Sequence, residues 1–458
     1  MKKLILPLVA LLLVAAAAAW YFLRKSNDAR NVIPSDAIAV AEFEPFELVR
    51  TYGLSVTDIP KMTADGYGID FTRPIYAFIT KNGLMCLTLN VTDEKAFTEF
   101  VRLYWGFASE EERGMLWLSS KSTTGYLADG KAIIAGPLSI AEQDAVKPQL
   151  AALLRQGRQD VPLLDEIEKQ QGVLRLAVPA GSLLAQSFSQ QQLSESGVKL
   201  SPDAMLFAAL RFGPQDVTIS ASISGLDKEL TNVFRPIEGS IDGLQASFPF
   251  LRACTNISGD KLLPLLRRIP QLRTTLLALN MVIDADMMLR AVDGDVTLTL
   301  SPCKLPMQSD YLLTAELSNT DFLAHADDWK TGFASGVQFV DRGNNDYLII
   351  YDGKKVFFGL RDGRLYVTSN PQLNLQTALP EELEAEQGKY LRAYLDAKRT
   401  LDYLGLPHYL HPYIAGWLNR LTLTVTSAES MELQLTTKQP IEDILSKITG
   451  KDANHNAR

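Results

Sequence analysis

The chain has few of the side chains that most enzymes use for chemistry. Its 458 residues include three cysteines and four histidines. Histidine is the commonest general base near neutral pH and a common metal ligand, so its scarcity limits both kinds of site. Cys86, Cys254 and Cys303 are widely spaced and odd in number, which argues against a disulfide framework and allows at most one bridge. Cys86 lies in an apolar run, so we expect a small buried side chain there.

Positive charge is also scarce. Acidic residues outnumber basic residues by 53 to 45. Five of the basic residues lie in the first thirty positions, which leaves a net charge of −12 on residues 31–458. Proteins that bind nucleic acids depend on Lys and Arg contacts with phosphates, so we predict no nucleic-acid partner.

Motifs for nucleophilic or phosphate chemistry are missing as well. The sequence has no Walker A loop, no G-x-G-x-x-G after a strand and no G-x-S-x-G elbow. Ser196 and Lys199 have the spacing of a Ser/Lys pair, but their polar surroundings favour a loop. His408 and His411 stand beside prolines without a second ligand pair, which favours loop or cap histidines. His325 falls beside acids on an expected solvated helix face.

Two acidic clusters are the remaining candidates for a metal site. Either could offer hard oxygen ligands to calcium, but neither follows the twelve-residue calcium loop with its glycine and bidentate glutamate. Turn formation explains the Asp-Gly-Asp segment without an ion. We therefore predict no catalytic residue, no metal site and no cofactor. The clusters consist of Asp284, Asp286, Asp293 and Asp295, and of Asp341, Asn344, Asn345 and Asp346.

Residues 1–30 are the most apolar part of the chain. The segment Leu4–Leu23 has no charged residue and is bracketed by basic pairs. At about 1.5 Å per residue, a helix of this length reaches about 30 Å, the thickness of a bilayer core. We predict a transmembrane anchor through residues 4–23 of a single-pass bacterial inner-membrane protein, with an N-inside topology and the body in the periplasm. The alternative is a cleaved signal peptide, because Ala15–Ala19 offers small residues for processing.

Four segments of the body recur in the same order a little over two hundred residues later. Residues 126–138 match residues 359–371, which sets Asp129-Gly130 over Asp362-Gly363. Asp-Gly between two apolar runs predicts a two-residue hairpin turn, and Asp352-Gly353 repeats the pattern. Residues 86–101 match residues 312–327, and residues 173–188 match residues 390–405. Two strand-like runs follow residues 173–188, and two more follow residues 390–405.

We predict an α+β fold on these grounds. Two tandem similar units, 32–236 and 237–450, would each form an antiparallel-rich sheet with helices packed on one face. One N-terminal transmembrane helix would precede them, and a polar tail, 451–458, would follow. The alternative is chance similarity between two α+β stretches. Tight turns join antiparallel strands, which disfavours a doubly wound nucleotide-binding fold.

Residues 32–49, VIPSDAIAVAEFEPFELV, open with Ile-Pro-x-Asp-Ala before an apolar strand and a helix. This opening resembles that of a family of Gram-negative cell-envelope proteins of unknown function. The resemblance rests on this short motif and on the general layout, and it implies an exported, membrane-tethered protein built from repeated α+β units. Many members of the family carry a lipid-modified cysteine where this chain has an apolar anchor. The family offers no catalytic residues to transfer.

The sequence therefore favours a non-enzymatic, membrane-anchored envelope protein that binds or scaffolds a partner protein or an envelope polymer. A first alternative is an envelope hydrolase with paired carboxylates, such as Glu42, Glu44 or Glu47, because paired acids need neither His nor Cys. A second alternative is a carrier of an apolar ligand between sheet and helices, which requires an empty lined cavity.

Overall fold

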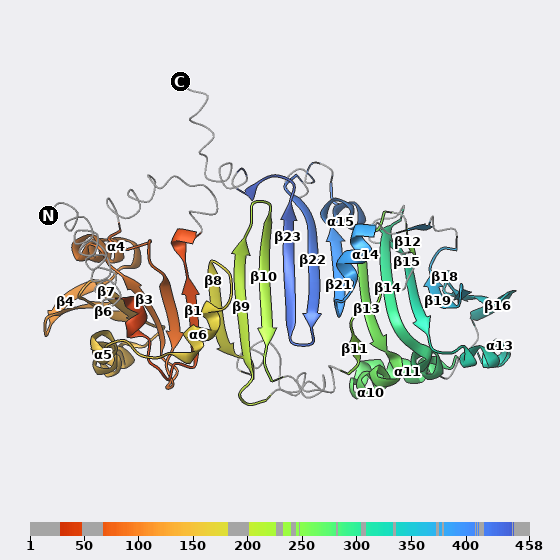
Figure 1. Cartoon of the computed structure of the whole chain (residues 1–458), viewed down its shortest axis with the longest axis horizontal. Coiled ribbons are helices and arrows are strands. Elements are labelled where there is room, and N and C mark those ends of the chain that lie inside the picture. Colours follow the sequence, from red (N-terminus) through yellow and green to blue (C-terminus); the bar gives the residue numbers. More distant parts are fainter. Residues whose placement is uncertain are drawn as a thin grey trace, which may run out of the picture. The chain divides into compact units, whose positions relative to one another are not determined.

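The computed structural model in Figure 1 describes most of the chain from Asp28 onward. The described residues form two compact units. Unit 1 holds those up to Pro179 together with Phe207–Phe212, and unit 2 holds those in Ala180–Leu206 and from Gly213 onward. The described residues are 28–47, 67–181, 201–225, 232–239, 244–246, 248–280, 283–303, 308–332, 336–371, 375–377, 380–407, 409, 411, 416–441 and 443.

Unit 1 is an antiparallel ladder with two longer helices, α4 and α5. Its elements are η1 (Ala29–Val32), β1 (Ala39–Phe43), β2 (Ile75–Ile79), β3 (Met85–Asn90), α4 (Glu94–Trp105), β4 (Ala108–Glu112), β5 (Met115–Ser119), β6 (Thr124–Ala128), β7 (Lys131–Ala135), α5 (Ile140–Arg155), α6 (Pro162–Glu168), β8 (Leu174–Pro179) and most of β9 (Met205–Phe212). Strand pairing gives the order β8, β1, β2, β3, β7, β6, β5, β4. The last strand, β4, exposes Ser109, Glu110 and Glu111.

Local sequence explains where the helices of unit 1 begin and end. Asp93 caps α4 by accepting hydrogen bonds from the backbone N–H groups of Lys95 and Ala96, at 2.9 and 3.0 Å. Phe97 and Val101 lie one turn apart on α4 and are buried in the core of unit 1. Ser139 opens α5 with a reciprocal capping box that uses Glu142.

Unit 2 has a longer antiparallel ladder. Its elements are β10 (Asp216–Ile223), β11 (Phe234–Arg235), β12 (Leu244–Ala246), β13 (Leu251–Ser258), α10 (Gly259–Arg268), α11 (Pro270–Asn280), α12 (Ala285–Ala291), β14 (Val292–Pro302), β15 (Ser309–Leu317), η2 (Asp321–His325), α13 (Ala326–Gly332), β16 (Val337–Gly343), β17 (Asp346–Tyr351), β18 (Lys354–Arg361), β19 (Arg364–Thr368), β20 (Leu375–Thr377), α14 (Pro380–Glu386), β21 (Leu391–Asp396), α15 (Ala397–Leu404), β22 (Leu418–Ser427) and β23 (Ser430–Thr437). The ladder runs β10, β23, β22, β21, β13, β14, β15, β19, β18, β17, β16.

The ladder of unit 1 has a counterpart in unit 2. The order β8, β1, β2, β3, β7, β6, β5, β4 corresponds strand by strand to β21, β13, β14, β15, β19, β18, β17, β16. Pairing registers correspond too, because Thr88 pairs with Ile133 and Thr314 with Tyr366. The sequence matches place these same residues opposite one another. The repeat boundaries 32–236 and 237–450 stay a prediction.

The Asp-Gly turns have the predicted conformation. Asp129 and Gly130 have φ values of 51° and 69°, and Asp362 and Gly363 have values of 52° and 76°. Asp352-Gly353 follows with 49° and 72°. Positive φ at both central residues is what a two-residue hairpin with the right twist requires. The turn prediction is therefore confirmed at all three places.

The predicted fold class is wrong. Hydrogen bonds assign 21 described strands to one antiparallel sheet, with β12 and β20 in a second, two-stranded sheet. The described strands therefore do not form the two expected separate sheets, each with a helix layer on one face. The misreading arose because polar residues alternate with leucines in many strands, and such alternation does not reveal how many strands share one sheet.

The predicted anchor is a second correction. None of the described helices combines the length and the apolar character that a membrane crossing requires. This finding stands against the predicted transmembrane signal anchor and against the single-pass inner-membrane location with a periplasmic body, which are not upheld. The segment Leu4–Leu23 itself, like the tail 451–458, lies outside the described residues.

Candidate functional site: an apolar strand face and a cationic pocket

One side of four neighbouring strands in unit 2 is apolar over three successive rows of residues. Alternate residues of β10, β23, β22 and β21 stand in register, so that Ile219, Leu433, Leu423 and Ala393 form one row across the strands. Side chains on alternate residues share one face of a strand. We call this set the apolar face, and it consists of Val217, Ile219, Ala221, Leu435, Leu433, Met431, Leu421, Leu423, Val425, Leu395, Ala393 and Leu391.

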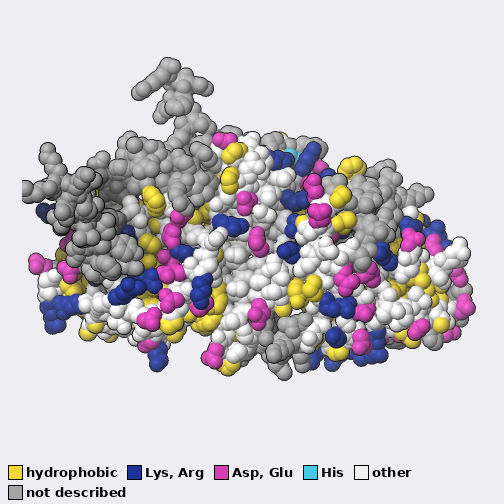
Figure 2. Space-filling model, in the orientation of Figure 1, with side chains coloured by type: hydrophobic (Ala, Val, Ile, Leu, Met, Phe, Trp, Pro, Cys, Tyr) yellow, Lys and Arg dark blue, Asp and Glu magenta, His cyan; other side chains and the backbone are white. Residues whose placement is uncertain are grey.

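The apolar face is the less buried of the two faces of these strands. Its side chains are all half-buried or exposed, and Ile219 and Met431 remain 43% and 48% exposed. On the opposite face Thr218, Thr422 and Tyr394 are buried. On the side that Figure 2 shows, few hydrophobic side chains lie over β10, β22 and β23. An antiparallel sheet normally buries its apolar side.

An apolar hollow lies at one end of this face. It has a volume of about 360 Å³ and is formed by the start of β9, the end of β10 and the hairpin between β22 and β23. Ala221, Val425 and Met431 of the apolar face line it, together with Leu206 and Ile223. Glu429 is the one charged residue among those that line the hollow.

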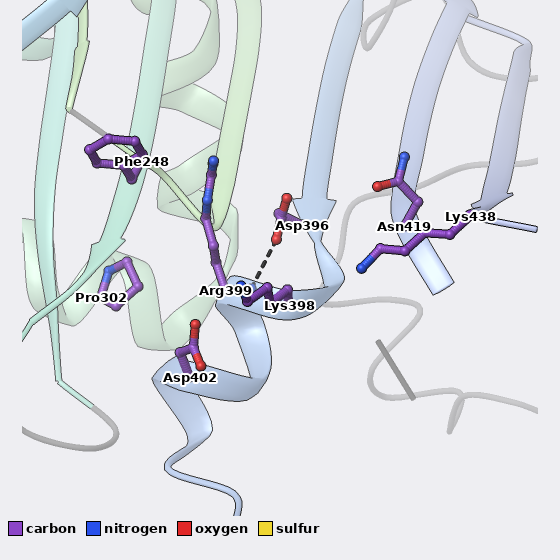
Figure 3. A pocket seen from close by; sticks show the side chains of 8 residues that line it. All are labelled: Phe248, Pro302, Asp396, Lys398, Arg399, Asp402, Asn419 and Lys438. Carbon is purple, nitrogen blue, oxygen red and sulfur yellow. Dashed lines mark hydrogen bonds between the residues drawn. The ribbon is translucent and has the colours of Figure 1, made fainter. Parts of the chain in front are cut away.

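A polar pocket lies at the opposite ends of β21, β22 and β23, where α15 begins (Figure 3). Its volume is about 500 Å³. Figure 3 shows Lys438 reaching toward the start of α15, and the guanidinium of Arg399 lies near Phe248. We call it the cationic pocket; it is lined by Phe248, Pro302, Asp396, Lys398, Arg399, Asp402, Asn419 and Lys438.

Several charged side chains of the cationic pocket have polar contacts. Asp396 caps α15 and accepts a hydrogen bond from the backbone N–H of Arg399 at 2.9 Å. The Arg399 guanidinium donates to the carbonyl of Pro249 at 2.9 Å, which fixes its position but adds no negative charge. Oδ1 of Asp402 lies 3.7 Å from Nδ1 of His411. The residues that line the pocket include the cations Lys398, Arg399 and Lys438 and the acids Asp396 and Asp402.

The cationic pocket and the apolar face share the same three strands. Asp396 follows Leu395 directly, Asn419 precedes Leu421 by two residues, and Lys438 comes three residues after Leu435. The four strands therefore carry cationic groups near one end and the apolar hollow at the other. Because side chains of alternate residues share a face, Asp396 and Lys438 lie on the side opposite Leu395 and Leu435, so the cationic pocket and the apolar face are on different sides of these strands.

The carboxylates considered for hydrolysis do not form a catalytic pair. Glu42 on β1 is buried, and its Oε2 lies 3.0 Å from Nη2 of Arg175 on β8. Glu44 bonds the same nitrogen. Burial raises the pKa of Glu42 to about 7, although Arg175 opposes the shift. Glu42, Glu44 and Glu47 do not line the cationic pocket or the hollow. Two acids that hold one guanidinium leave no space for a substrate between them.

The remaining polar candidates have structural roles or lie outside the described residues. Ser196, Lys199 and His408 belong to the residues that are not described, and His325 ends η2. His411 Nε2 lies 2.9 Å from the carbonyl oxygen of Leu406, and His411 is a helical residue rather than a loop residue.

The acidic clusters are used for caps, turns and ion pairs. Asp284 caps α12, and Asp295 accepts bonds from the backbone of Glu238 and Gly239 and from Asn256. Asp341 accepts a bond from the backbone of Gly343 in the turn that follows it. Asp286 pairs with Arg267, Asp293 with Arg235, and Asp346 with Arg342, while Asn344 and Asn345 form the turn with positive φ. Within the described ranges, no group of His, Cys, Asp or Glu could hold a metal ion.

The three cysteines of the chain are free thiols. Cys86 and Cys254 are buried, and Cys303 is half-buried. The prediction that Cys86 is a small buried side chain is therefore confirmed.

Comparison with known proteins adds no family. No protein family and no curated protein matches the sequence. Among solved structures, crystal form III of TP0453 is 17% identical, covers 43% of this chain and 80% of that chain, and has a TM-score of 0.29. A DnaN sliding clamp from Bartonella birtlesii is 11% identical, covers 88% and 100% of the two chains, and has a TM-score of 0.11. At such TM-scores neither likeness carries an argument about this chain. The envelope-family resemblance stays a prediction.

Proposed function

We propose that this protein is a non-enzymatic binding protein that holds an aliphatic chain on the apolar face. The observation that carries the proposal is the face itself: three residues on each of four strands, all apolar and all accessible in part. Each methylene removed from water contributes about 0.8 kcal/mol, so an alkyl chain placed there gains affinity without any hydrogen bond.

The dimensions of the apolar face fit one acyl chain. Rows two residues apart are separated by about 7 Å along a strand, so three rows span about 14 Å. Half of a bilayer core, which accommodates one acyl chain, is about 15 Å deep. The hollow at the end of the face, at about 360 Å³, lies within the range of ligand pockets, about 300–1,000 Å³. Met431 at its rim has an unbranched, adaptable side chain that suits variable chain ends.

The other functions suggested by the sequence receive less support. A polymer of sugars is recognised through hydrogen bonds, and the side chains of the apolar face have no donor or acceptor beyond the sulfur of Met431. A protein partner uses a polar rim with about ten hydrogen bonds. Partner binding thus stays a prediction, while the carrier of an apolar ligand is the alternative that the described cavities favour.

Binding of a neutral long-chain alcohol with a terminal pyrene tests the proposal on the full chain. We expect saturable binding and a rise in pyrene fluorescence. Replacing Ile219 with Asp puts a charge in the middle row, and we expect affinity to fall about tenfold or more, since burying a side chain of this size is worth about 1.5 kcal/mol or more.

Ser220→Asp is the matched control, because Ser220 is the next residue of β10, is exposed and faces the other side. It introduces the same charge without touching the apolar face. Leu433→Gln, in the same row, covers the case in which Ile219→Asp does not fold, as judged by circular dichroism. Unchanged alcohol binding in both folded apolar-face variants, or equal loss in Ser220→Asp, would overturn the proposal.

A further inference from the structure

The apolar face continues beyond the four strands that define it. Leu251 and Ala253 of β13 pair with Leu395 and Ala393 of β21, so they lie on the same side of the sheet as the apolar face. Two leucines of β14 pair with Leu251 and Ala253 in turn and extend the same two rows. All four side chains are half-buried. We call this set the side extension; it consists of Leu251, Ala253, Leu298 and Leu300.

The opposite side of β13 and β14 is the covered one. Arg252 of β13 is 1% exposed and forms an ion pair with Glu386 of α14. Thr299 of β14 is buried as well. On the apolar side, Val296 follows the side extension along β14 and packs against a buried core cluster of unit 2. The accessible apolar surface therefore spans six neighbouring strands, β10, β23, β22, β21, β13 and β14 (Figure 1).

This surface is wider than a single aliphatic chain. Neighbouring strands are about 4.8 Å apart, so six strands span about 24 Å. Carbon atoms attract one another appreciably only at separations of about 4 Å, so one chain that lies along the strands covers about two of them. The hollow lies between the end of β10 and the hairpin of β22 and β23, which places one chain on that side of the surface. The apolar residues of β21, β13 and β14 would then stay in contact with water.

We propose that the ligand is a lipid with two aliphatic chains. One chain lies over β10, β23 and β22 and reaches the hollow, and the second chain lies over β21 and the side extension. This inference rests on the proposed function and names its ligand class. The second chain has no hollow of its own, but its link to the first chain gives it an effective concentration of about millimolar at the side extension. Its burial removes further apolar surface from water, both on the lipid and on the protein.

The side extension offers a ligand no polar partner. None of its four side chains has a hydrogen-bond donor or acceptor. Thr255 is the next residue on this side of β13, and its hydroxyl donates to the carbonyl of Tyr390 at 2.7 Å. Selection by this part of the surface therefore depends on the number of chains and not on the head group, so neutral probes are sufficient to test it.

The test compares two neutral pyrene-labelled probes on the full chain: the long-chain alcohol and a diacylglycerol with chains of the same length. We expect the diacylglycerol to bind about tenfold more tightly or better. Leu298→Asp places a charge beneath the second chain, and we expect it to lower the affinity for the diacylglycerol to that for the alcohol without changing alcohol binding. Leu251→Gln, on the neighbouring strand, covers the case in which Leu298→Asp does not fold, as judged by circular dichroism.

Ser220→Asp is again the control for added charge and should leave both affinities as they are in the unaltered protein. Equal affinities for the two probes would overturn the two-chain inference while leaving the proposed function standing. An advantage of the diacylglycerol that survives in both folded variants, or that Ser220→Asp also removes, would overturn it in the same way. Failure of both probes to bind would overturn the proposed function itself. Probe binding that falls as the protein dimerises would show that a second copy covers the surface, and it would overturn both.

Discussion

Each unit holds the guanidinium of a strand arginine, half-buried Arg175 in unit 1 and buried Arg252 in unit 2, but the two units match its charge differently. In unit 1, Nη2 of Arg175 is shared by Glu42 and Glu44, and Oε2 of Glu42 is left without a hydrogen bond. In unit 2, Arg252 binds Glu386 through two parallel hydrogen bonds, of 2.7 and 2.9 Å. The second arrangement pairs two guanidinium nitrogens with both oxygens of one carboxylate and leaves Nη1 of Arg252 without a hydrogen bond, whereas the first leaves a buried carboxylate poorly compensated.

The difference shows that a buried ion pair is not one kind of interaction. Arg252 and Glu386 are 1% and 4% exposed and neutralise each other, so each depends on the other. Glu42 is also buried, yet its pKa is raised to about 7, mainly by loss of solvation. We therefore expect unit 2 to fail when its pair is broken and unit 1 to respond to pH.

The largest expected effect is loss of one partner in unit 2. Glu386→Gln leaves the Arg252 charge buried without a counter-ion, and we expect the free energy of unfolding to fall by about 3–5 kcal/mol. Urea unfolding of the full chain measures this. Glu99→Gln removes an exposed pair with Arg102 and is the control, expected to change stability by less than about 1 kcal/mol. Similar losses in both variants would erase the contrast between buried and exposed pairs.

The next effect concerns the pH dependence of unit 1. The pKa of Glu42 rises from 4.5 to about 7 on folding, so the folded state binds its proton more tightly. Stability should therefore fall as pH rises from about 5 to 8, by about 2–3 kcal/mol at 1.36 kcal/mol per pKa unit. Glu42→Gln should remove this slope and make the protein more stable than the unaltered chain at pH 8.

Unfolding at several pH values between 5 and 8 provides the measurement for Glu42. Glu44→Gln is the comparison, because it removes the more exposed of the two acids that share Arg175. If the free energy of unfolding depended on pH in the same way in Glu42→Gln and in the unaltered chain, Glu42 would not be the titrating group. The expected contrast in pH dependence between the units would then be wrong.

A smaller effect should separate two turns of the same type. Gly130 and Gly363 both have positive φ, 69° and 76°. A methyl group at Gly130 would lie 3.2 Å from the carbonyl oxygen of Val91, whereas one at Gly363 would meet nothing within 4 Å. We expect Gly363→Ala to cost about 1 kcal/mol through backbone strain alone and Gly130→Ala to cost more, both measured by urea unfolding. Equal costs would show that the contact with Val91 does not matter.

Features governed by neighbouring residues could be predicted from the sequence. Positive φ at Asp129-Gly130 follows from the two residues themselves, and the start of α4 follows from Asp93 and the helix period after it. Residues that match between the two halves of the sequence also have corresponding strand partners, since Thr88 pairs with Ile133 and Thr314 pairs with Tyr366. The turn and the helix start depend on neighbouring residues, and the matches depend on sequence similarity between the two halves. Predicting them requires no knowledge of long-range contacts.

The long-range arrangement of the strands could not be predicted from the sequence, for a physical reason. Alternation in VTISASI, RLTLTVTS and MELQLTT is plain in the sequence, but it does not say which face of a strand other elements cover. The polar residues Thr218 and Thr422, which alternation assigns to solvent, are buried instead. Lys398 and Lys438 are far apart in sequence and meet only because β21, β22 and β23 are neighbours. The sequence therefore did not predict the residues of the candidate site.

The strand β4 closes the ladder of unit 1, and its only described pairing partner is β5. Its outer backbone groups would offer a template for a strand from another molecule if nothing opposed the approach. Glu110, Glu111 and Glu112 follow one another there. If the β4 edges of two molecules approached each other, their glutamates would repel. This acidic run therefore opposes edge-to-edge association of two copies of the protein.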